Sequence, residues 1–216
     1  DEVIAGIRNE RRYRLLLLHD FHPSLTLPLW NPLPLAVGAV GYLRHGKFVT
    51  LLNCFYPDKA ANGGGGGGAG LPSVYGQNVA RRYSFPLRAG HKTAYLCTES
   101  TVYRYIENLD APKKWFKANV DAIMQQYGEM AQIQKEDLYL VIGTLDAPDY
   151  ALFVSHNHPD GQAHFNVFSA PKTGQPWGTF TTDAEVSASQ VSATGGPWDT
   201  VLVARLRFKP DVAEPT

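Results

Sequence analysis

The sequence predicts an α+β fold, in which a twisted, mostly antiparallel β-sheet carries one main helix and a short helix before it. Three observations lead to this prediction. Short β-branched and aromatic runs, separated by Pro, Gly and Asp, fill the first and last thirds of the chain and are typical of strands. Helical periodicity is confined to the stretch between them. The order of strands, helices and strands is that of an α+β domain.

The composition favours a single globular domain over residues 1–216. The chain is 44% apolar, and at 216 residues one core can bury most of the unfolded surface. Its 20 Lys and Arg balance 20 Asp and Glu, so no broad basic field favours nucleic acid as a partner. The two cysteines, Cys54 and Cys97, stand in strand-like runs and are expected to be reduced thiols.

The N-terminal residues contain no apolar signal core followed by small residues. The apolar runs are also too short for a transmembrane helix. We therefore expect a cytoplasmic protein without a transmembrane segment.

The first third should be strand-rich. The run RYRLLLLHDF, residues 12–21, predicts a buried strand that ends at His22-Pro23. Residues 38–43 and 47–56 flank the turn Arg44-His45-Gly46 and predict a β-hairpin. The glycine-rich tract at 62–70 predicts a flexible surface loop, because it offers no side chains to pack.

Two further strands, 83–88 and 91–98, are expected to pair with each other across Ala89-Gly90. The apolar period then changes to that of a helix. Residues 102–109 have apolar side chains at i, i+3, i+4 and i+7, which predicts a short helix.

The main helix is expected at about 112–127. Asp110 followed by Pro112 is a helix-start signal, and Gly128 is a helix-end signal. The side chains expected to pack on the sheet are Phe116, Val120, Ile123 and Tyr127.

The last third returns to strands and contains the main candidate site. Residues 155–166, SHNHPDGQAHFN, predict a hairpin whose turn pairs His158 with Gln162 and sets His156 opposite His164. Three imidazoles on one face would be a first shell for zinc or another divalent ion, with a fourth position open for water. The alternative is a polar, solvated hairpin tip, and no cofactor is certain.

Two weaker candidates are also present. Asp20 and His22 share one face of an extended chain, so the carboxylate could orient the imidazole as a general base. The favoured alternative is that Asp20 and His22-Pro23 simply end a buried strand. Trp30, Trp177 and Trp198 lie among Pro, Gly and Asn in loop-like surroundings. Such rings can form the floor of a ligand site, or they can plug the end of a sheet core.

The strands and loops together resemble a group of uncharacterised intracellular proteins and N-terminal domains from mushroom-forming (agaric) fungi. The resemblance spans about residues 12–210, and it implies a basidiomycete origin and, because some members precede receptor-like modules, a defence or self-recognition role. It implies no activity and no site residue. The stretches that carry it are Trp30-Asn31-Pro32, 38–43, 46–57, the helix with Trp115, 136–155 and 177–180.

The sequence thus favours a soluble intracellular binding or interaction domain, whose ligand would be a protein, a small molecule or a carbohydrate. The alternative is a metal-dependent hydrolase or nuclease that uses the three histidines. A further alternative is a gasdermin-like pore-forming domain. The balanced charge disfavours it, because such domains bind anionic membranes through a basic patch.

Overall fold

The structure is a computed structural model that describes residues 2–55, 79–156, 160–184 and 186–216. In these residues the chain forms two α-helices and twelve strands, which pair antiparallel. The predicted α+β fold with mostly antiparallel sheet is therefore confirmed. The glycine-rich tract at 62–70 lies outside the described residues, so its role as a loop stays a prediction.

The chain divides into two compact units, and each unit is assembled from three separate segments. Whether the two units behave as one domain, as the composition predicts, stays a prediction. Unit 1 comprises Asp1–His19, Asn62–Thr101 and Ala147–Trp198, and unit 2 comprises Asp20–Ala61, Val102–Asp146 and Asp199–Thr216.

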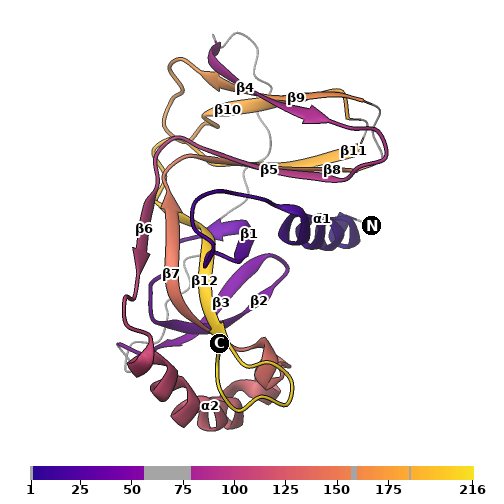
Figure 1. Cartoon of the computed structure of the whole chain (residues 1–216). Helices are drawn as coiled ribbons and strands as arrows, with labels where there is room; N and C mark the ends of the chain where they lie inside the picture. The colour runs from indigo at the N-terminus through magenta and orange to yellow at the C-terminus, as the bar shows by residue number, and fades with distance from the viewer. Residues whose placement is uncertain (1, 56–78, 157–159, 185) are drawn as a thin grey trace. The chain divides into compact units, whose positions relative to one another are not determined.

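Unit 1 contains two three-stranded sheets that pack face to face (Figure 1). Their facing side chains are largely aromatic. Phe85 stacks on Tyr95 with ring centroids 4.4 Å apart, and Phe153 meets Phe180 at 5.2 Å. The first sheet consists of β4 (Val79–Leu87), β9 (Gly161–Phe168) and β10 (Gly178–Thr182), and the second of β5 (Thr93–Thr98), β8 (Tyr150–His156) and β11 (Val186–Val191).

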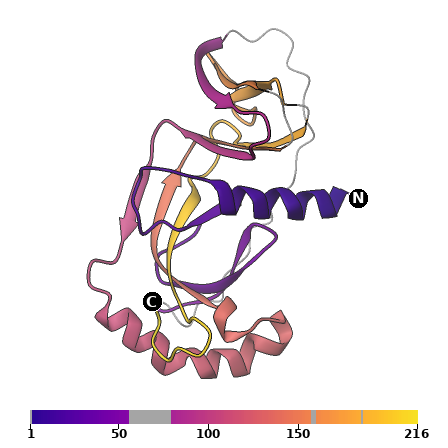
Figure 2. The same cartoon turned by 45° about the vertical axis from the view of Figure 1, so that its right-hand side comes forward.

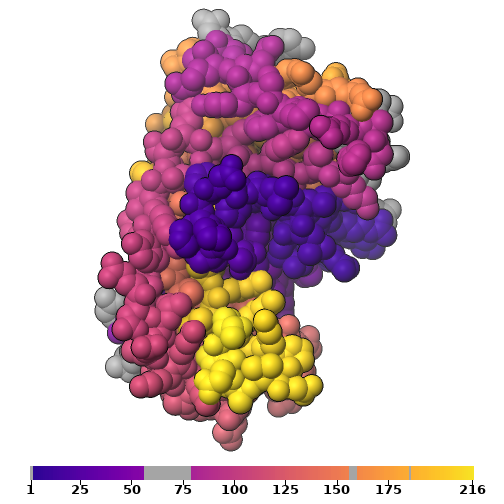
Figure 3. All heavy atoms as spheres, viewed as in Figure 1, coloured from indigo at the N-terminus to yellow at the C-terminus, as the bar shows by residue number. Residues whose placement is uncertain are grey.

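Helix α1 (Glu2–Leu16) contacts β5 and β8 of unit 1, and it replaces much of the strand predicted at 12–21. Of the leucine run, only Leu17 is buried, whereas Leu15 and Leu18 are 65% and 91% exposed. Atoms of these N-terminal residues lie open at the surface in Figure 3. The prediction was wrong because it took the four leucines as a buried run. Local helix formers and the Glu10 to Arg14 ion pair, at 2.9 Å and spacing i,i+4, favour the helix instead.

Unit 2 is built on one curled sheet with the strand order β1-β12-β7-β2-β3, and β6 pairs with the free part of the β7 edge (Figure 2). The predicted hairpin is confirmed as β2 and β3. His45 and Gly46 have φ of 51° and 77°, so the turn is a two-residue loop with both residues left-handed. The strands are β1 (Leu27–Leu33), β2 (Ala39–Arg44), β3 (Lys47–Asn53), β6 (Val102–Tyr105), β7 (Tyr139–Ala147) and β12 (Asp199–Arg207).

The main helix is confirmed as α2 (Asp110–Ala131), which is followed by the short 3-10 helix η1 (Lys135–Asp137). Helix α2 continues past Gly128 and ends at Gln132, whose φ of 54° is left-handed. The amide of Ile133 donates to the Gly128 carbonyl and closes this end. The core beneath the helix combines Phe116, Val120 and Ile123 with Val40, Tyr42, Leu140 and Leu206 of the sheet and with Phe208, which follows β12.

The short helix predicted at 102–109 is wrong, because residues Val102–Tyr105 form β6. The amide of Ile106 also donates to the Ile142 carbonyl, so this stretch stays on the β7 edge. The Val and Tyr side chains of this stretch suit a strand as well as a helix. β2 pairs only with the first residues of β7, and the rest of that edge of β7 forms hydrogen bonds with this stretch, which favours the strand.

Two predicted strand pairings are also wrong. β4 pairs with β9 rather than with β5, and β8 pairs with β5 and β11 rather than with β9. In both cases the connection carries the chain from one sheet of unit 1 to the other. The crossing connections allow apolar side chains of both sheets to pack in shared clusters, and this burial stabilises the arrangement.

Candidate functional site

The candidate site is the outer face of the β4-β9-β10 sheet, defined by Arg82, Ser84, His164, Asn166, Thr179 and Thr181. Side chains alternate along β9, so Ala163, Phe165 and Val167 are buried in the sandwich and the residues between them take the other face. The pairing register sets Arg82 and Thr179 beside Asn166, and Ser84 and Thr181 beside His164.

Asn166 organises this face. Although it lies on the outward side, it is only 3% exposed, because its neighbours enclose it. Its side-chain oxygen accepts from Arg82 Nε at 2.7 Å, and its Nδ2 donates to the Thr179 carbonyl and the Thr181 hydroxyl, both at 3.2 Å. Both ends of the amide are therefore engaged, as a buried polar group requires. The network restricts the Arg82 guanidinium through its Nε bond.

The next row of the sheet pairs a hydroxyl with an imidazole. Ser84 Oγ lies 2.8 Å from His164 Nδ1, and Thr181 stands on the other side of His164. Ser84 and Thr181 are exposed and His164 is half-buried. The face thus presents hydrogen-bonding groups in two adjacent rows at fixed positions.

The charged neighbours of this face are engaged elsewhere. Arg81 Nη2 contacts Glu99 Oε1 at 2.5 Å, and the Tyr83 hydroxyl donates to the same oxygen at 3.2 Å. Burial of the ring, and then the Glu99 carboxylate, raise the pKa of Tyr83. The Asp183 carboxylate accepts a hydrogen bond from the backbone amide of Gln162 at 3.0 Å, at the end of the face beyond His164.

The three histidines predicted as metal ligands are not joined by the predicted hairpin. His156 is opposite Val186, whereas His164 is opposite Ser84 and Thr181 in the other sheet. His158 lies outside the described residues, and so does the side chain of His156. Within the described part of the chain no cluster of His, Cys, Asp or Glu has a metal-binding arrangement. The cross-strand argument for zinc was therefore wrong, and a role of these residues in binding metal stays a prediction.

His22 is placed beside a serine and a tyrosine rather than beside Asp20. The Ser24 hydroxyl lies 2.6 Å from His22 Nδ1 and 3.0 Å from the Tyr103 hydroxyl. The Ser24 amide also donates to His22 Nδ1 at 3.1 Å, so the contact belongs to a local turn. Among the described residues, Asp20 makes no hydrogen bond or ion pair with His22.

The tryptophans predicted to form a ligand floor separate into two kinds. Trp30 and Trp177 are 4% and 3% exposed, and Trp177 Nε1 donates to the Tyr150 carbonyl at 2.9 Å. Burial of these two rings favours the alternative that they plug the core. Trp198 is 46% exposed and stays a candidate for ligand contact.

Both cysteines are free thiols, as the sequence predicts. Burial raises the pKa of Cys97 to about 12 and also raises the pKa of the half-buried Cys54. A thiol with so high a pKa is a poor nucleophile at neutral pH, so Cys97 belongs to the core.

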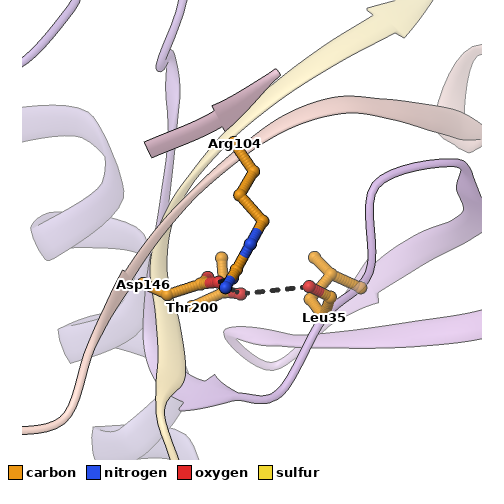
Figure 4. A network of polar contacts seen from close by, with 4 residues as sticks. All are labelled: Leu35, Arg104, Asp146 and Thr200. Carbon is orange, nitrogen blue, oxygen red and sulfur yellow. Dashed lines mark hydrogen bonds and ion pairs between the residues drawn. The ribbon is translucent and has the colours of Figure 1, made fainter. Parts of the chain in front are cut away.

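A buried carboxylate in unit 2 has a structural role (Figure 4). Asp146 accepts from Arg104 Nη1 at 2.7 Å and from the Thr200 hydroxyl at 2.5 Å, and that hydroxyl also lies 3.4 Å from the Leu35 carbonyl oxygen. Both carboxylate oxygens have partners, so this network ties β6, β7 and β12 together.

The outer face was not identified from the sequence, although part of the residue pattern that predicts it was present. The alternation of polar His164 and Asn166 with apolar neighbours is visible in the sequence. Arg82 and Ser84 could not be assigned to it, because their strand was expected to pair with 91–98.

No protein-family model and no curated protein matches the chain. Of the helices in the described residues, neither combines the length and the apolar content that a membrane span requires. The family resemblance therefore stays a prediction.

Proposed function

We propose that this chain is a binding domain and that the outer face of the β4-β9-β10 sheet is its recognition surface. The observation that carries the proposal is the hydrogen-bonded unit of Arg82, Asn166 and Thr181, in which an outward-facing amide is almost fully buried. An ordinary solvated sheet face leaves its polar side chains in water.

Fixed polar side chains suit recognition for an energetic reason. Ordering a long side chain when a partner binds costs about 0.5–1.5 kcal/mol. In this face the bond from Arg82 Nε to Asn166 restricts the guanidinium before any partner arrives. Arg is also among the residue types enriched at protein interfaces.

The partner we propose is a protein or a small molecule rather than nucleic acid, since the chain has no net charge. A defence role in a fungal cell would be compatible with such a binding domain, and it rests on the resemblance alone.

A blocking substitution tests the recognition surface. Thr179 is exposed, and it supports Asn166 only through its carbonyl oxygen, so Thr179→Tyr places a bulky, uncharged side chain on the face and leaves that bond available. Peptides selected from a random phage-display library on the wild-type protein should fail to bind this variant. Ala118→Tyr, at an exposed position of α2, is the matched control and should bind them normally.

The readout is the fraction of selected peptides that each variant still binds in a plate assay, with melting curves to show that all three proteins are folded. If the peptides bind the Thr179→Tyr protein as well as the wild type, the recognition surface lies elsewhere and the proposal fails.

A further inference from the structure

We infer that the outer face contains a preformed receptor for a carboxylate group, with the Arg82 guanidinium at its centre. This inference rests on the proposed function and specifies the ligand chemistry of the same surface. The carboxylate would come from an Asp or Glu side chain or a C-terminus of a partner protein, since Arg82, Ser84 and Thr181 are exposed on a sheet face that a protein surface can reach.

Most of the hydrogen-bond donors of Arg82 are available to a ligand. A guanidinium carries five N–H groups, and only Nε–H is used within the described residues, where it binds Asn166. The four N–H groups of the two terminal nitrogens have no partner in the described part of the chain. These two nitrogens form the end of the guanidinium plane, which matches the two oxygens of a carboxylate in a bidentate pair.

Asn166 restricts the orientation of the Arg82 guanidinium. Asn166 is held by two donor bonds of its own, to Thr179 and Thr181, and is 3% exposed. Its side-chain oxygen therefore stays in place, and the Nε bond to this oxygen restricts the directions in which the Arg82 guanidinium can point. A planar, oriented guanidinium selects a planar carboxylate over a spherical anion.

The positive charge of Arg82 matches the single negative charge of a carboxylate. Arg82 supplies one positive charge to this face, since Arg81 is paired with Glu99. The Asp183 carboxylate lies at the far end of the face, next to Gln162. A singly charged carboxylate is balanced by Arg82, whereas a phosphate group carrying about two negative charges would be left with an excess.

Further hydroxyl groups accompany the guanidinium. Ser84 and Thr181 occupy the row beside it and are exposed, so their hydroxyls lie on the face to which the carboxylate would bind. Ser84 is held by His164 Nδ1 at 2.8 Å, which limits its freedom in the same way.

The test uses sodium acetate as the probe and nuclear magnetic resonance of the full chain as the readout. Acetate should shift the Asn166 side-chain amide signal and the Thr181 backbone signal saturably, beyond the effect of sodium chloride at equal ionic strength. Sodium phosphate, titrated in parallel, should produce weaker shifts.

Arg82→Lys keeps the charge but loses both the Nε bond and the planar pair of nitrogens, so we expect acetate to bind about tenfold more weakly. The matched control is Arg81→Lys, which makes the same change next to Arg82 in the chain, keeps a positive charge beside Glu99 and should leave acetate binding unchanged. Both positions are exposed, so both variants should fold.

Three results would overturn the inference: wild-type shifts no larger than those with chloride, an Arg82→Lys protein that titrates like the wild type, or tighter binding of phosphate than of acetate. Each leaves the proposed function standing if Thr179→Tyr still abolishes binding of the selected peptides. Conversely, acetate binding together with unchanged peptide binding by Thr179→Tyr would remove the proposed recognition surface and keep only the anion site.

Discussion

At the scale of single residues, burial decides what the polar and reactive side chains can do. Asn166 and Asp146 are both buried, and both have their hydrogen-bonding atoms engaged. The difference lies in their partners. Asp146 ties strands of unit 2 together, whereas Asn166 holds an arginine whose remaining N–H groups lack a partner among the described residues.

The cysteines provide a prediction at this scale. Iodoacetamide at pH 8 should modify Cys54 in the native protein and leave Cys97 unmodified, because burial raises the pKa of Cys97 to about 12 and shields its sulfur. Mass spectrometry of the peptides measures both. In urea both should react, and equal rates in the native protein would contradict the burial of Cys97.

The same pKa shift affects stability in alkali. The folded state keeps the Cys97 proton to about pH 12, whereas the ordinary thiol pKa is 9.0. The unfolded chain therefore loses the proton first, and the contribution of Cys97 to stability is complete below pH 9.0 and is lost as the pH rises toward 12.

At the scale of elements, an apolar stripe with helical spacing predicted α2 correctly but predicted a helix wrongly at residues 102–109. The stripe of Phe116, Val120 and Ile123 was visible in the sequence and is buried in the structure, where it packs on the curled sheet of unit 2. The stripe in residues 102–109 was as regular, and it became a strand. The difference is that the β7 edge beside it needed a partner.

The stripe of α2 supplies a second prediction. Ile123→Ala should lower the free energy of unfolding by about 2–5 kcal/mol, because it leaves a cavity between α2 and the sheet. Urea unfolding measures the change. Gln126→Ala, at an exposed position of the same helix, is the control and should change stability by less than about 0.5 kcal/mol. Equal effects of the two substitutions would mean that Ile123 is not part of the core.

At the scale of the whole molecule, the path of the chain couples the two units. Each unit closes three segments that are separated in sequence by segments of the other. If one unit unfolds, its segments become long flexible loops within the other unit, and closing longer loops costs more entropy. This coupling favours cooperative unfolding of the two units.

Calorimetry tests this coupling. Phe165→Ala removes a core ring of unit 1 and Phe116→Ala removes one of unit 2, and each should cost about 3–5 kcal/mol. If the units unfold together, each variant should shift one common transition to lower temperature. Two transitions, of which each variant moves only one, would show two independent domains.

What the sequence determined by itself was local. The period of α2, the β2 and β3 hairpin with its His45-Gly46 turn, and the alternation of His164 and Asn166 along β9 all follow from side-chain spacing and turn chemistry. Such patterns depend on neighbours within a few residues, so they can be recognised without knowing the rest of the fold.

Only the tertiary structure decided which strands pair. β4 and β5, like β8 and β9, are consecutive in the chain but lie in different sheets, and their apolar side chains pack against each other between the two sheets. That long-range choice separated His164 from His156 and brought it to Ser84, and it placed Arg82 on Asn166. The candidate site consists of residues from strands that meet only in the folded chain.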